Sequence, residues 1–168
     1  MNKQSLFFTV LVGVISLLLL LGLLQFLAKK TFKNSPFEKP SWSFLIWQCT
    51  WLIPFFIFLK SALEITENTI ETVIYSNTIQ NTFIYSVGKI LLYIGFTFMF
   101  TILVNKIIDV IDKYFFSKNN TTIELENNNV IYFTFKLLLI VGLTFSFLTV
   151  FEHFLNWFVP SIETPFYH

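Results

Sequence analysis

Three ionisable residues interrupt the last long apolar stretch of the chain. Lys136 stands near its beginning, and Glu152 and His153 stand near its end. Charges inside a hydrophobic helix often mark ion or proton pathways, so a Lys136–Glu152 pair would suggest such a pathway. Their separation of sixteen positions corresponds to about 24 Å of helical rise. Within one helix the two cannot meet, and we expect each side chain to reach its own membrane interface as an anchor.

Partners from other helices are an open alternative for these residues. Glu152 could meet Lys89 or Lys60, because the topology given below places all three at the outer end of the bundle. Such a pair would fix helix register rather than do chemistry. His153 is the only histidine near an apolar stretch, since His168 is terminal. A bis-histidine haem needs two ring nitrogens, which only a dimer could supply, so we expect an interfacial packing role.

A second polar group surrounds Pro54. Proline donates no backbone hydrogen bond, so the carbonyl of Thr50 loses its helical partner and a kink is expected. Gln48 or a neighbouring helix could satisfy that carbonyl. If the protein forms a pore, its expected lining is Gln48, Thr50 and Lys136. Farther along, Gly88 and Gly95 lie two turns apart and would let another helix approach closely.

The remaining candidate sites point away from catalysis and metal binding. Glu64, Glu67 and Glu71 share one helix face, but a di-iron site also needs Glu-x-x-His, and no histidine follows at that spacing. A solvated face is expected, with Lys60 and Glu64 as an i, i+4 pair. Cys49 is the only cysteine, which excludes an intramolecular disulfide. Phosphate-loop, GxSxG and HExxH motifs are also absent, so neither a cofactor nor an enzyme is expected.

The composition is that of a membrane protein. The 168 residues are 55% hydrophobic and 12% charged, against about 25% charged in an average soluble domain. Mean hydropathy is +0.69. A net charge of +1 gives no electrostatic case for nucleic acid as a partner.

Four stretches are long enough to cross a hydrocarbon core of about 30 Å, at about residues 5–28, 42–59, 88–107 and 134–155. The first is longer than the apolar region of a signal peptide and ends in Lys29-Lys30, so we expect an uncleaved span.

Two polar flanks of these stretches have alternative interpretations. We prefer a helical extension and a turn for residues 60–81, with a hairpin around Ser76-Asn77 as the alternative. The amphipathic stretch after Lys106 is expected to leave the membrane and continue along or above its surface.

The lysine distribution predicts the orientation of the chain. Cytoplasmic ends and loops should hold the larger group: Lys29, Lys30, Lys33, Lys39, Lys106, Lys113, Lys118 and Lys136. The outside then keeps Lys3, Lys60 and Lys89. We therefore expect an all-α, four-transmembrane-helix bundle, built from two helical hairpins as one membrane domain over residues 1–168, with the N-terminus and the C-terminus outside.

The second hairpin carries a family resemblance. A long apolar helix ends in Lys106-Ile-Ile-Asp-Val-Ile111, and after a polar loop Glu124-Leu-Glu-Asn-Asn-Asn-Val130 enters a glycine-containing helix. This arrangement resembles the YjfL-like family of small bacterial inner-membrane proteins, which are built from two such hairpins. The resemblance covers residues 94–150, and Ile131, Tyr132 and Phe133 replace the alanines expected after the asparagines. It implies a four-helix fold and little about biochemical role.

These observations favour a small, multi-pass protein of a bacterial inner (plasma) membrane without enzymatic activity. With 23 phenylalanines and few polar groups, an accessory subunit that packs within a membrane protein complex is the leading hypothesis. Expected partners are the lipid bilayer and either other integral membrane proteins or further copies of the chain. The alternatives are an oligomeric ion channel or small-solute transporter and, third, a membrane-embedded enzyme.

Overall fold

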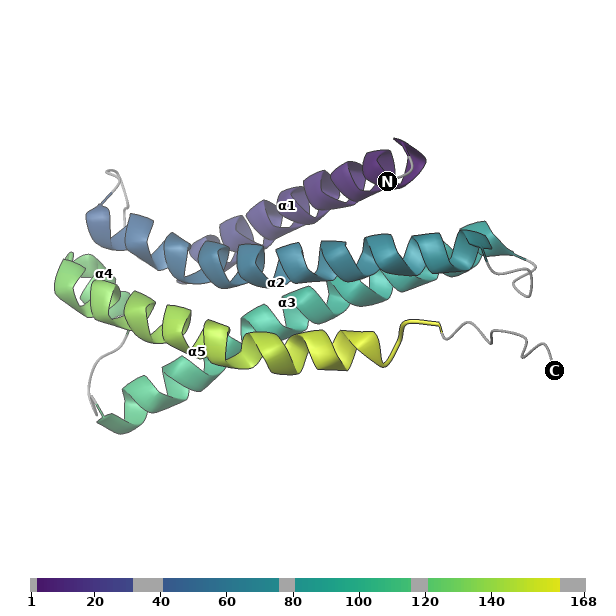
Figure 1. Cartoon of the computed structure of the whole chain (residues 1–168). Coiled ribbons are helices and arrows are strands. Elements are labelled where there is room, and N and C mark those ends of the chain that lie inside the picture. The colour runs from purple at the N-terminus through teal and green to yellow at the C-terminus, as the bar shows by residue number, and fades with distance from the viewer. Residues whose placement is uncertain (1–2, 32–40, 76–80, 116–120, 161–168) are drawn as a thin grey trace.

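The computed structural model describes residues 3–31, 41–75, 81–115 and 121–160. Its regular elements there are helices (Figure 1): α1 (Lys3–Thr31), α2 (Trp42–Tyr75), α3 (Thr82–Phe115), α4 (Thr121–Glu126) and α5 (Val130–Asn156). In this part of the chain, four helices are long and apolar enough to cross a membrane, within Thr9–Lys29, Trp42–Val73, Thr82–Tyr114 and Val130–Asn156. The prediction of an all-α, four-span bundle is confirmed.

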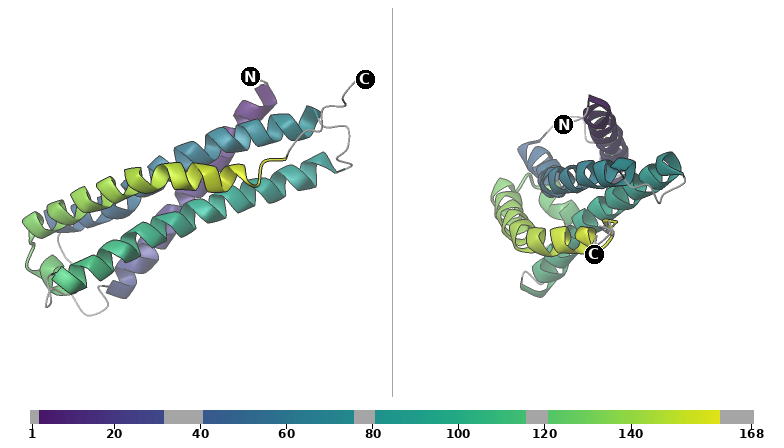
Figure 2. Two further views of the ribbon diagram at one scale, coloured as in Figure 1. Left: turned by 60° about the horizontal axis from the view of Figure 1, so that its bottom comes forward. Right: turned by 45° about the vertical axis from the view of Figure 1, so that its right-hand side comes forward.

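Helix α2 is the centre of the bundle. Its most extensive contacts are with α3 and α5, and α3 also contacts α5. Helix α1 packs mainly on α2 and crosses the other helices at an angle, as the two views of Figure 2 show. Neighbours in each expected hairpin therefore touch, but the larger contacts run between the hairpins.

Aromatic side chains fill the middle of the α2–α3–α5 core. Phe58, Phe100 and Phe151 are buried, one from each helix. The ring of Phe151 lies 4.9 Å from that of Phe58 and 5.0 Å from that of Phe100. The buried hydroxyls of Thr97 and Thr144 each donate to the carbonyl one turn earlier in their own helix, as is usual for threonine in apolar helices. The centre of the core is therefore apolar.

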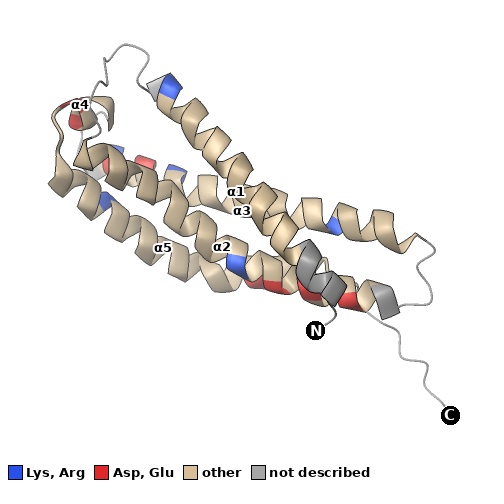
Figure 3. Ribbon diagram, turned by 90° about the horizontal axis from the view of Figure 1, so that it is seen from above, with Lys and Arg blue, Asp and Glu red and all other residues tan. Residues whose placement is uncertain are grey.

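The long second and third helices follow the unbroken apolar patterns of the sequence. Helix α2 continues to Tyr75, which confirms the predicted helical extension; the turn expected at 76–80 lies outside the described residues. Lys60 and Glu64 form the expected pair at 3.7 Å, with side chains 80% and 63% exposed. Figure 3 shows the acidic residues in a row along this half of α2.

The asparagine-rich stretch before α5 is a structured connector. Asn129 caps α5 by accepting from the Tyr132 amide at 3.1 Å, and its own amide group donates to Glu124 at 2.6 Å. Asn128 has φ of 49°, a left-handed conformation that asparagine tolerates better than most residues. Its side-chain oxygen accepts from the backbone amide of Ser43 at 3.2 Å. The connector thus joins the start of α5 to the start of α2.

Candidate functional site: a buried charge cluster

Lys136 of α5 is buried between two carboxylates of α3. Its side chain is 4% exposed, and its Nζ lies 2.8 Å from Oδ1 of Asp109 and 3.0 Å from Oδ2 of Asp112. The side chain of Asp112 is 6% exposed and that of Asp109 is 35% exposed. Lys136 is therefore an interhelical ion-pairing residue, and the interpretation of this side chain as an interfacial anchor is replaced by this geometry.

Helical spacing brings the members of this cluster together. Asp109 and Asp112 are three residues apart, and Tyr132 and Lys136 are four apart, so each pair lies on one face of its helix. The hydroxyl of Tyr132 donates to Oδ2 of Asp112 at 2.9 Å. The Lys136 ammonium also lies 5.9 Å from the centre of the Tyr132 ring, within cation–π range.

The segment of α3 after Lys106 continues the helix to Phe115. Ile108 and Asp112 of this segment are buried against the rest of the bundle. Lys106 is 70% exposed and lies 4.0 Å from Oδ2 of Asp109. Two ammonium groups thus face two carboxylates, and the cluster has formal charge balance, which favours its burial.

A second interhelical contact lies beside the charge cluster. The side-chain amide of Asn105 donates to the carbonyl of Thr50 at 3.2 Å and to that of Thr101 at 3.0 Å. Thr50 is the residue whose carbonyl Pro54 deprives of its helical partner. Of the two expected donors, Gln48 and a neighbouring helix, it is therefore the neighbouring helix α3 that supplies the missing hydrogen bond. Asn105 is 3% exposed, so this bond ties α2 to α3 inside the bundle.

A cavity of about 390 Å³ adjoins both contacts. Its polar lining includes Thr50, Asn105, Asp109 and Lys136, and Trp47 and Trp51 contribute apolar walls. An ammonium, a carboxylate and an amide converge there, which is a combination that can hold a small polar molecule.

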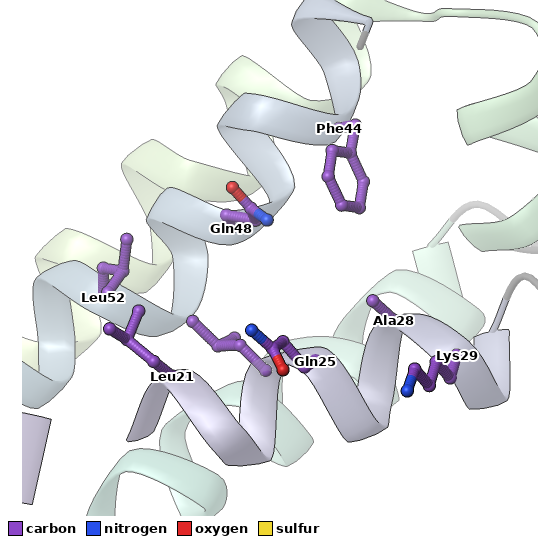
Figure 4. Close-up of a pocket in the computed structure, with 8 residues that line it drawn as sticks. Leu21, Gln25, Ala28, Lys29, Phe44, Gln48 and Leu52 are labelled. Atoms are coloured by element: carbon purple, nitrogen blue, oxygen red, sulfur yellow. The ribbon is translucent and has the colours of Figure 1, made fainter. Parts of the chain in front are cut away.

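Gln48 lies apart from the other two expected pore residues. It lines a different cavity, between α1 and α2, together with Gln25 and Lys29 (Figure 4). Thr50 and Lys136 share the cavity beside the charge cluster. The structure thus brings together two of the three residues that we expected to line one pore.

The candidates at the opposite end of the bundle have separate partners. Ser61 donates to Glu152 at 2.7 Å, so the structure pairs Glu152 with a hydroxyl rather than with either lysine that we considered. Lys89 donates to the backbone oxygen of Phe158 at 2.6 Å. His153 is exposed on α5. In the described ranges, His, Cys, Asp and Glu side chains form no group of three or more that could hold a metal ion.

Sequence reasoning missed the partners of Lys136. A usable signal exists, because Asp109 lies six residues before the end of α3 and Lys136 lies six residues after the start of α5. The two residues therefore stand about 9 Å from the same end of antiparallel helices. Asn105 was likewise treated as part of an apolar stretch.

Comparison with known proteins identifies no relative. No family model, curated protein or solved structure matches the chain. The resemblance to the YjfL-like family therefore stays a prediction.

Proposed function

We propose that this four-span membrane protein is a non-enzymatic accessory subunit that packs against further helices in the membrane. The supporting observation is an open glycine face on α3. A methyl group added at Gly88 or Gly95 would lie more than 4 Å from every atom beyond its chain neighbours and the nearby backbone of its own helix. Around them, Leu91 is 65% and Met99 is 47% exposed. Glycine faces allow close helix–helix approach in membranes, and no helix of the described chain uses this one.

The interior of the bundle supports the same proposal. Phenylalanines occupy the middle of the α2–α3–α5 core, so the polar groups at the two ends are separated by apolar packing. Within the charge cluster, Lys136, Asp109 and Asp112 each have a partner at hydrogen-bonding distance, and the exposed Lys106 lies 4.0 Å from Asp109. A saturated cluster of this kind fixes helix register more readily than it transfers protons. We therefore place the functional surface on the outside of the bundle, toward a second copy of the chain or another membrane protein.

Gly95→Leu tests the proposal. We expect association of the protein in native membranes to weaken about tenfold, or about 1.4 kcal/mol, because the new side chain holds the partner helix away. The fold should persist, since leucine favours helix over glycine. Native gel mobility and identification of co-purified proteins measure the effect and distinguish self-association from a foreign partner.

Gly142→Leu is the matched control, because Gly142 is an open glycine on α5 that has no second glycine on its helix, unlike the Gly88–Gly95 pair of α3. It should leave association unchanged. A wild-type protein that is monomeric without any bound protein would contradict the proposal, as would equal association of wild type and Gly95→Leu.

The cavity beside the charge cluster favours small-solute transport as the second candidate. Its lining by Asn105, Asp109 and Lys136 could hold an ion or small polar solute. This alternative predicts ion flux above background in proteoliposomes, reduced severalfold by Lys106→Gln, which removes an exposed charge from the cavity wall. Lys113→Gln removes an exposed charge that does not line it and should leave flux unchanged. Flux equal to that of protein-free liposomes would eliminate this candidate.

A further inference from the structure

We propose that the cavity between α1 and α2 binds an anionic phospholipid, with the headgroup phosphate near Lys29. The cavity measures about 390 Å³. It is lined by Leu21, Leu24, Gln25, Ala28, Lys29, Phe44, Gln48 and Leu52. This site is distinct from the α3 glycine face, so it goes beyond the proposed subunit function.

The polar side chains of this cavity come from both helices. Figure 4 shows Gln25 of α1 and Gln48 of α2 on facing walls, with Leu21 and Leu52 toward one end and Lys29 toward the other. Leucines thus line one end of the cavity, the other end has Lys29 as its polar residue beside Phe44 and Ala28, and the two amides lie between the ends.

Neither glutamine has a hydrogen-bond partner among the residues that the structure describes. Gln25 is exposed and Gln48 is half-buried, and an unsatisfied amide costs several kcal/mol in hydrocarbon, so water or the polar groups of a lipid complete these hydrogen bonds. An entirely apolar helix docked here would leave both amides unpaired. An occupant that pairs these amides carries hydrogen-bonding atoms at the level of Gln25 and Gln48.

The depth of the Lys29 end of the cavity matches a lipid headgroup. Lys29 directly follows the apolar run 5–28 of the first helix, and lysines at the ends of such runs extend to the membrane interface. Leu21 lies eight residues earlier, about 12 Å deeper along the helix. A phospholipid presents the same sequence of groups, with phosphate and ester oxygens above and acyl chains below. The ammonium of Lys29 selects an anionic headgroup, and the two amides can donate to phosphate or ester oxygens.

The test compares lipid retention by native mass spectrometry. Protein is reconstituted into nanodiscs of either phosphatidylglycerol or phosphatidylcholine and then released. We expect the wild type to retain phosphatidylglycerol preferentially. The Gln25→Leu/Gln48→Leu variant should lower that occupancy about tenfold, and Lys29→Gln should remove the preference for phosphatidylglycerol while changing no apolar contact.

Two controls match these substitutions. Asn156→Leu removes an exposed amide at the far end of α5, and Lys113→Gln removes an exposed charge from α3; both should retain lipid as the wild type does. A wild type that retains no phospholipid overturns the proposal, as does equal retention by wild type and Lys29→Gln. Loss of a co-purified protein from the double-glutamine variant, with lipid unchanged, would instead assign the cavity to a partner protein.

Discussion

Replacing Lys136 with methionine is expected to destabilise the bundle by about 3–5 kcal/mol, the cost of breaking a buried ion pair by removing one partner. Methionine fills a similar volume but leaves Asp112, whose side chain is 6% exposed, without its cation. Asp109 keeps Lys106 at 4.0 Å, so Asp112 carries most of the loss. Unfolding of the purified protein in mixed detergent micelles measures the change.

Two further variants separate charge from packing at Lys136. The triple variant Lys136→Met/Asp109→Asn/Asp112→Asn should recover most of the lost stability, because no unpaired ion stays buried. Lys106→Met should cost less than about 1 kcal/mol, since it breaks an exposed pair. If Lys136→Met destabilises no more than Lys106→Met, the cluster does not hold α3 to α5.

Replacing Asn105 with leucine is expected to cost about 1–3 kcal/mol, which is the penalty for a buried polar group without a partner. The substitution removes the side-chain amide that donates to the Thr50 carbonyl at 3.2 Å. The backbone of α2 cannot supply another donor to that carbonyl, because residue 54 is a proline. The same unfolding measurement applies, with Asn156→Leu as an exposed asparagine control.

The decisive comparison uses Pro54. In a Pro54→Ala background, the amide of residue 54 can donate to the Thr50 carbonyl, and Asn105→Leu should then cost much less. A double-mutant cycle gives the coupling directly. Strictly additive effects would show that Asn105 stabilises the bundle by some means other than the Thr50 carbonyl.

Sequence patterns predicted the elements well because they depend on local properties. Long apolar runs without breakers correspond to α2 and α3, and the i, i+4 spacing of Lys60 and Glu64 produced the expected pair. Pro54 likewise predicted that the backbone carbonyl of Thr50 has no partner within its own helix. Each of these follows from residues close together in the chain.

The site depended on helix rotation and packing, which local patterns do not specify. The spacing of Lys136 and Glu152 matches the thickness of a bilayer, so both appeared to be anchors. Once α3 and α5 pack, Asp109 and Asp112 face Lys136 and that interpretation no longer applies. The sequence could not identify the partner of the Thr50 carbonyl for the same reason, because only the packed bundle brings Asn105 beside α2.

The hydrogen bonds of α2 also bear on the order in which the protein is assembled during synthesis. Three polar groups along this helix, at Ser43, Thr50 and Ser61, bond to Asn128, Asn105 and Glu152, respectively. All three partners are translated after α2, and two of them only with the last third of the chain. The second helix is therefore translated before all three partners, and the set of bonds is complete only once Glu152 of α5 has been made.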